Sequence, residues 1–123
     1  MKRYGFPKSA HLLRSLDFRK VYEEGRRRNL EWLVAFALAT GNKASRVGFT
    51  LPAAFGPAVD RNRMKRRLRE AVRKHWGQLG PGWDIVINPR RAGLAMDISR
   101  IEQTVCKLFQ SCARAGGDRG SKQ

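Results

Sequence analysis

Residues 58–76 read AVDRNRMKRRLREAVRKHW, a stretch in which apolar and cationic residues are sorted at helical spacing. The apolar positions share one stripe of a helix, and they are Met64, Leu68, Ala71, Val72 and Trp76. Most other positions are cationic: Arg61, Arg63, Lys65, Arg66, Arg67, Arg69, Arg73 and Lys74. The stretch predicts an amphipathic helix that buries one stripe in a core and presents a cationic surface to its surroundings.

The cationic surface of this helix points to a polyanionic partner. Like charges one turn apart repel each other, and within the stretch only Asp60 and Glu70 offset that repulsion. A merely solvated helix face usually mixes both signs of charge, whereas this face does not. We therefore predict that the helix binds nucleic acid.

The whole chain is strongly basic. It carries 26 Lys and Arg against 10 Asp and Glu, which gives a net charge of +16 over 123 residues. Arginine predominates, and its planar guanidinium suits bidentate contacts to phosphate. No apolar run is long enough to span a membrane, and no signal-peptide core follows Lys2 and Arg3. We expect a cytoplasmic protein with nucleic acid, not a membrane, as its partner.

Length and composition favour one RNA-binding domain over residues 1–115, followed by a disordered basic tail at residues 116–123. The first helix is expected at residues 15–24, capped by Ser15 and ended by Gly25. Two strands, at residues 32–40 and 46–51, are expected to form an antiparallel hairpin that turns at Gly41 and Asn42. Periodicity does not decide whether residues 26–30 form a further strand.

The second half of the chain predicts one more strand and one more helix. Residues 83–88 read as a strand closed by Pro89. The last helix is expected to start near Ser99, which stands at capping-box spacing from Glu102. Its apolar stripe is Ile101, Val105, Leu108, Phe109 and Cys112. The expected fold class is α+β, a single-domain α-β sandwich of three helices and one sheet of about four strands in the order αβββαβα.

Residues with catalytic chemistry are scarce. His11 and His75 are the only histidines, and Cys106 and Cys112 match no metal-ligand spacing. No glycine-rich phosphate loop, nucleophile elbow or carboxylate pair is evident. The residues therefore predict a binding protein without catalytic residues or a bound cofactor or metal of its own.

Three aromatic residues have two readings. Phe18 and Tyr22 lie one helical turn apart, and Phe36 stands in the middle of a strand whose two faces are both apolar. They are either core residues or a platform on which unpaired bases stack, at about 1–3 kcal/mol per base.

Residues 56–70, GPAVDRNRMKRRLRE, closely resemble the signature of the bacterial ribonuclease P protein subunit. The surroundings match in order and spacing: residues 15–25 resemble the first helix of the family, residues 46–48 the start of a strand, and residues 83–87 its late strand. The resemblance covers about residues 12–112, nearly the whole folded part.

The resemblance implies a specific function. Family members join a catalytic RNA to form ribonuclease P, which removes 5′ leaders from precursor transfer RNA. The RNA and its magnesium ions perform the hydrolysis, so no autonomous activity and no obligate protein partner are expected. The residues implied in docking on the RNA subunit are Arg61, Asn62, Arg63, Lys65, Arg66 and Arg69. The leader-binding candidates are Phe18, Tyr22, Phe36 and Arg46.

Two further points follow from the resemblance. The family fold implies a left-handed βαβ crossover, an exception to the usual handedness. The family commonly has Ser-Lys-Lys before the motif glycine, but this chain has Pro52, Ala53, Ala54 and Phe55 before Gly56. Two cations are therefore missing there, and the candidates to replace them are Arg46, Arg90 and Arg91.

Charge alone fits other classes of protein. A ribosomal or other structural RNA-binding protein would need no leader cleft, so it would bury the three aromatic residues. A DNA-binding regulator would read the major groove with residues 61–73, although only Asn62 there is typical of a base-reading residue. A stand-alone nuclease would need metal ligands.

Overall fold

The structure, a computed structural model, describes residues 7–12 and 14–117. Its main elements are α1 (Ser15–Glu24), β1 (Arg26–Leu30), β2 (Leu33–Ala39), β3 (Arg46–Phe49), α2 (Ala58–Lys74), β4 (Trp83–Pro89) and α3 (Ile98–Gly117). The predicted α+β class and the element order are confirmed, and residues 26–30, left open by the sequence, form a strand.

The sheet has the strand order β1-β2-β4-β3. β1 and β2 form an antiparallel hairpin, β4 is antiparallel to β2, and β3 is parallel to β4. The predicted hairpin over residues 32–51 is therefore wrong, because β4 lies between the two strands that were expected to pair. β3 is parallel because α2 connects it to β4, and such a crossover returns the chain in the same direction. The handedness of this crossover stays a prediction.

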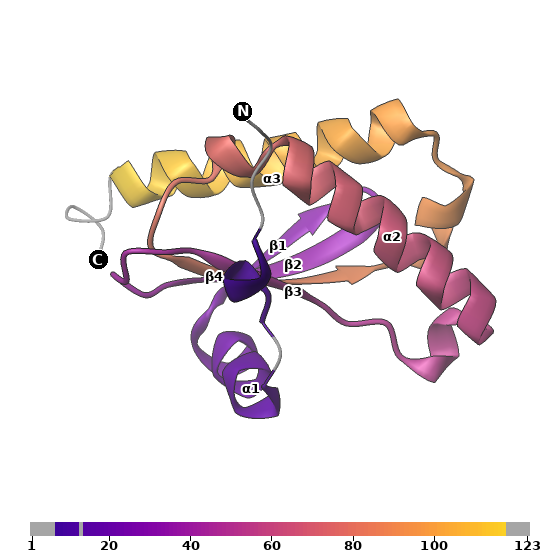
Figure 1. Ribbon diagram of the computed structural model, residues 1–123, viewed down its shortest axis with the longest axis horizontal. Coiled ribbons are helices and arrows are strands. Elements are labelled where there is room, and N and C mark those ends of the chain that lie inside the picture. Colours follow the sequence, from indigo (N-terminus) through magenta and orange to yellow (C-terminus); the bar gives the residue numbers. More distant parts are fainter. Residues whose placement is uncertain (1–6, 13, 118–123) are drawn as a thin grey trace.

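The helices cover the two faces of the sheet unequally (Figure 1). α2 and α3 lie side by side on one face, and α1 alone lies on the other. The main core is on the two-helix face, where the predicted stripe residues of α2 and α3 are buried: Met64, Leu68, Ala71, Val72, Ile101, Val105, Leu108, Phe109 and Cys112. Trp76, the last residue of the predicted α2 stripe, lies just after the helix and is half-buried. The α1 face has only a small cluster, so it is the less completely covered side of the molecule.

Two helix ends differ from the sequence predictions. α1 begins at Ser15, but its N-cap residue is Arg14, and no side chain caps it. α3 begins at Ile98, and the Asp97 carboxylate accepts the Arg100 backbone N–H at 2.9 Å. Asp97 therefore caps the N-terminus of α3, a role that the sequence analysis had predicted for Ser99. Of the predicted tail, Gly116 and Gly117 belong to α3, and residues 118–123 lie outside the described residues.

Candidate nucleic-acid interface

The outer surface of α2 carries cations that form no close ion pair within the part of the chain that the structure describes. Among the described residues, no hydrogen bond or ion pair engages the following exposed side chains of the predicted docking set: Asn62, Arg63, Lys65, Arg66 and Arg69. Other cations of the helix are paired. Arg73 makes an ion pair with Glu70 at 2.7 Å, and this hydrogen bond lowers the pKa of the Glu70 carboxyl. The unpaired residues thus form the part of α2 that is most available to a phosphate backbone.

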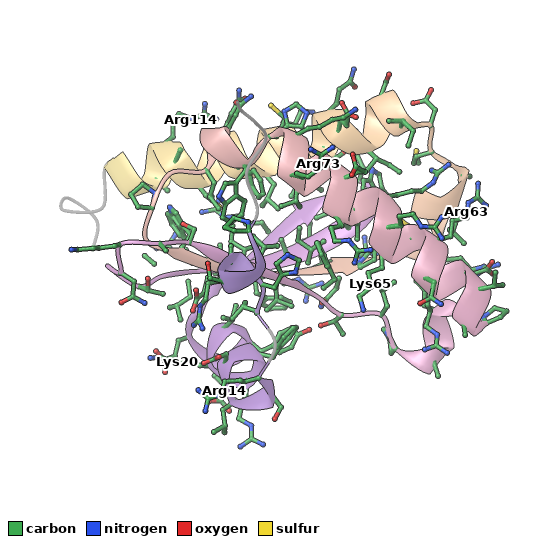
Figure 2. The ribbon with its side chains drawn as sticks, viewed as in Figure 1. Arg14, Lys20, Arg63, Lys65, Arg73 and Arg114 are labelled. Carbon is green, nitrogen blue, oxygen red and sulfur yellow. The ribbon has the colours of Figure 1, made fainter. Side chains whose placement is uncertain are left out.

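These side chains spread over a broad arc of the helix. At about 100° per residue, Lys65 and Arg63 are separated by about 160°, and Asn62, Arg66 and Arg69 fall between them. Figure 2 shows Lys65 and Arg63 leaving α2 on different sides. The flank that bears Arg67 and Lys74 faces α3 and the loop before it, because Arg67 donates to the Met96 carbonyl and Lys74 pairs with Glu102. α3 lies over β1, where Arg28 donates to Ser111, so the opposite flank of α2, which bears Lys65, lies toward the β3 edge of the sheet.

The start of α2 is anchored by two arginines. Arg61 Nε donates to the Gly56 carbonyl at 3.1 Å, so this predicted docking residue also has a structural role. Arg91 donates to the Phe55 carbonyl and pairs with Asp60, both at 3.0 Å. Gly56 has a φ of +151°, a backbone conformation that residues with a side chain rarely adopt, which explains the glycine of the motif.

The same contacts bear on the two missing lysines. Of the cations considered as replacements, Arg91 lies beside the loop that carries Ala53 and Ala54, and its side chain is 58% exposed. Arg46 is committed to carboxylates on other elements.

The three predicted aromatic residues come together on the α1 face of the sheet. Phe18, Tyr22 and Phe36 are all partly exposed and pack around the buried residues Leu12, Val21 and Val86. The rings of Tyr22 and Phe36 meet edge to face, with centroids 4.9 Å apart. A Cβ atom on Gly48 would collide with the Phe18 ring, so the glycine lets this ring lie directly on β3. The rings therefore form a half-open apolar surface that is not a sealed core.

Polar contacts fix this aromatic surface in position. The Tyr22 hydroxyl lies 2.7 Å from Thr50 Oγ1 and donates to Asn88 Oδ1 at 2.9 Å. These bonds join α1 to the segment after β3 and to β4, so the ring of Tyr22 is held at a fixed angle to the sheet.

Arg46 connects α1 to the sheet. Its guanidinium pairs with Asp84 at 2.7 Å and with Asp17 at 3.3 Å, so it links β3, β4 and α1. The hydrogen bond with Asp84 raises the pKa of the Arg46 guanidinium. Asp84 is one of the few buried polar residues among those described, and Arg46 is its ionic partner. Arg46 thus lies on the α1 side of the sheet with its charge engaged by two carboxylates, and its predicted role in leader binding stays a prediction.

The predicted residues fall into two groups separated by the sheet. The docking set lies on α2, on one face, and the aromatic set with Arg46 lies on the other. Sequence reasoning did not single out Arg27 and Asn29, which share the aromatic face because they pair in register with Phe36 and Val34. Only the knowledge that residues 26–30 form a strand next to β2 would have placed them there.

Residues 7–12 and 14–117 contain neither a membrane-spanning helix nor a cluster of metal ligands. No helix there is long and apolar enough to cross a bilayer. No group of three or more His, Cys, Asp or Glu side chains lies close enough together there to hold a metal ion.

Cys106 and Cys112 are free thiols, and burial raises the pKa of Cys112, which agrees with the predicted packing role.

Known proteins match this chain over nearly all of its length. The family profile described as Ribonuclease P matches residues 6–113. The ribonuclease P protein component of Symbiobacterium thermophilum is 41% identical over 111 residues, covering 89% of this chain and 94% of the relative. That of a Roseiflexus species is 42% identical over 110 residues, covering 89% and 88%.

Solved structures agree with the fold. The ribonuclease P protein of Thermotoga maritima is 30% identical and superposes with a TM-score of 0.73, covering 80% of this chain and 94% of that one. The Staphylococcus aureus protein superposes with a TM-score of 0.74 at 22% identity, covering 85% and 95%, and supports the fold alone.

The fold, the cationic helix and these relatives define a small, basic α+β RNA-binding protein of a ribonucleoprotein. The chain belongs to the ribonuclease P protein family, whose members are the protein components of an endoribonuclease in transfer RNA processing.

Proposed function

We propose that this protein joins a catalytic RNA to form ribonuclease P and helps it to remove 5′ leaders from precursor transfer RNA. The unpaired cations of α2 bind the RNA subunit, and the aromatic surface beside α1 binds the single-stranded leader. The RNA and the magnesium ions that it binds perform the hydrolysis. In this proposal the protein contributes affinity and orientation, and it acts in the cytoplasm.

The observation that carries the proposal is the separation of two surfaces of different chemistry. Arg66 and Arg69 offer free cations for a folded RNA backbone on one side of the molecule. Tyr22 and Phe36 offer partly exposed rings for unpaired bases on the other side. A protein that assembles with one RNA and holds a flexible part of another needs two such surfaces.

The main alternative is a structural RNA-binding protein such as a ribosomal protein. That function needs only a cationic surface, and it would allow the aromatic residues to be fully buried. Phe18, Tyr22 and Phe36 are instead partly exposed on the less covered face of the sheet, which favours the leader-binding proposal.

Reconstitution tests the proposed function directly. We expect the purified protein to restore precursor cleavage to a bacterial ribonuclease P RNA at low magnesium, where the RNA alone cleaves slowly, because cations of the protein replace part of the ionic screening. Single-turnover cleavage of a labelled precursor measures this effect. The protein without RNA is the control. Cleavage by the protein alone, or no stimulation of the RNA, would refute the proposal.

A second experiment tests the aromatic surface. We expect Phe36→Leu to weaken binding of precursor transfer RNA to the assembled enzyme by about 1–3 kcal/mol, because leucine fills space but offers no ring on which a base can stack. Binding of mature transfer RNA, which has no leader, should change little. Equilibrium binding of both RNAs to the reconstituted enzyme is the measurement.

The matched control for this variant is Phe109→Leu. Phe109 is fully buried on the other face of the sheet, so its replacement should lower the melting temperature and leave the preference for precursor unchanged. If Phe36→Leu also affects only the melting temperature, the ring is a core residue and the leader assignment is wrong.

A further inference from the structure

The aromatic surface continues onto β1. Strand register places Arg27 opposite Phe36 and Asn29 opposite Val34, so their side chains project from the same face of the sheet as the aromatic rings. α1 packs mainly over β2 and β4, and both Arg27 and Asn29 are exposed. The face thus extends from the rings to an open polar edge.

Arg27 is available to bind an anion. Its Nε donates to Asn29 Oδ1 over 3.4 Å, a long and exposed hydrogen bond that leaves the terminal donors of the guanidinium free. No carboxylate of the described residues pairs with it. An arginine held beside aromatic rings on an exposed sheet suits the backbone phosphate of a single strand whose bases stack on those rings.

The positions of the docking surface and the aromatic surface indicate in which direction the RNA leader would cross the sheet. α3 lies over β1, where Arg28 donates to Ser111, and α2 with its docking residues lies beside α3 on the side of β3, so a catalytic RNA bound to α2 would lie nearer to the β3 edge than to β1. A leader that starts there crosses Phe18 over β3 and then Tyr22 and Phe36 before it reaches β1. β1 is the strand farthest from the β3 edge, so Arg27 would meet nucleotides remote from the cleavage point.

We propose that Arg27, with Asn29 beside it, forms a distal phosphate subsite that binds only precursors with leaders long enough to reach β1. This inference rests on the proposed function, because it assumes that the leader lies on the aromatic surface. It adds a length-dependent element of substrate selection that the docking and aromatic residues do not explain.

The test compares Arg27→Ala with Arg26→Ala in the reconstituted holoenzyme. Both residues are exposed arginines of β1, and both replacements remove one charge, but Arg26 pairs with Ala37 and projects from the opposite face. Affinity is measured for precursors that differ only in leader length, together with mature transfer RNA. Arg27→Ala should weaken binding of long-leader precursor by about ten-fold and lower the slope of log affinity on log salt by about 0.7. Arg27→Lys should retain part of the affinity.

The outcomes separate the subsite from the wider proposal. Little effect of Arg27→Ala on a single-nucleotide leader, and little effect of Arg26→Ala on any leader, would support the subsite. Equal losses in the two variants, or equal losses at all leader lengths, would overturn it. If the unmodified holoenzyme shows no preference for precursor over mature transfer RNA, the leader-binding proposal itself has failed.

Discussion

Replacing Arg66 and Arg69 together by alanine is expected to weaken assembly with the RNA subunit at least about a hundred-fold. Both side chains are exposed on α2 and make no hydrogen bond or close ion pair among the described residues, so each can contact phosphate. A hydrogen bond to a charged group contributes about 1.5–3 kcal/mol, and about 1.4 kcal/mol corresponds to a ten-fold change in affinity. Binding of labelled protein to the RNA subunit at fixed salt is the measurement.

Arg73→Ala is the matched control for this double variant. Arg73 lies on the same exposed side of α2, but it pairs with Glu70 at 2.7 Å. The Glu70 carboxylate already neutralises part of its charge, so Arg73 attracts a polyanion less strongly than an unpaired arginine does. We expect its removal to have a much smaller effect on assembly. If Arg73→Ala weakens binding as much as either single alanine variant at Arg66 or Arg69, the RNA responds to total charge and not to the docking surface.

Replacing Arg46 by alanine is expected to destabilise the protein by about 3 kcal/mol. The change leaves the buried Asp84 carboxylate without its ionic partner, and the removal of one member of a buried ion pair costs about 3–5 kcal/mol. We place the effect at the lower end because the Arg46 side chain is 31% exposed and partly solvated. The melting temperature should fall by on the order of 10 °C.

Arg100→Ala gives the comparison for an exposed pair. Arg100 and Glu31 form an ion pair at 2.9 Å with side chains 50% and 41% exposed, so removing this arginine should lower the melting temperature far less than removing Arg46 does. A second variant, Asp17→Asn, tests whether Arg46 also contacts the leader. If it does, releasing Arg46 from Asp17 should strengthen precursor binding. If Arg46 only positions α1, the same change should weaken it. A stable Arg46→Ala protein would contradict the structural role.

Local periodicity predicted the helices well. The stripes through Met64 and Leu68 in α2, and through Ile101 and Leu108 in α3, are buried as expected. Helical spacing alone decides which residues share a face, so no knowledge of the partner surface was needed. The ends of the helices were less predictable, because Ser99 and Asp97 are both competent caps and only the path of the chain selects between them.

The prediction of which strands pair was the main error of the sequence analysis. Gly41 and Asn42 give a strong turn signal, yet the strands on either side of them are separated by β4. The hairpin that forms instead turns at Glu31 and Trp32, where neither residue is a usual turn former and Glu31 has a φ of +33°. The buried Trp32 ring donates its indole N–H to Thr104 at 3.0 Å, so a contact with α3 supports a turn that the local sequence does not favour.

Some candidate functional residues were predictable from the sequence, and others were placed only by the tertiary structure. The sequence by itself determined the cationic surface of α2, because charge and helical spacing are local properties, and its motif also indicated the family. Only the tertiary structure decided that Arg46 forms ion pairs with Asp84 and Asp17, and that Arg27 lies beside Phe36. These facts depend on which strands are neighbours. The order of strands in a sheet is set by the packing of both faces and by the crossover through α2, and neither is encoded within any short stretch of the chain.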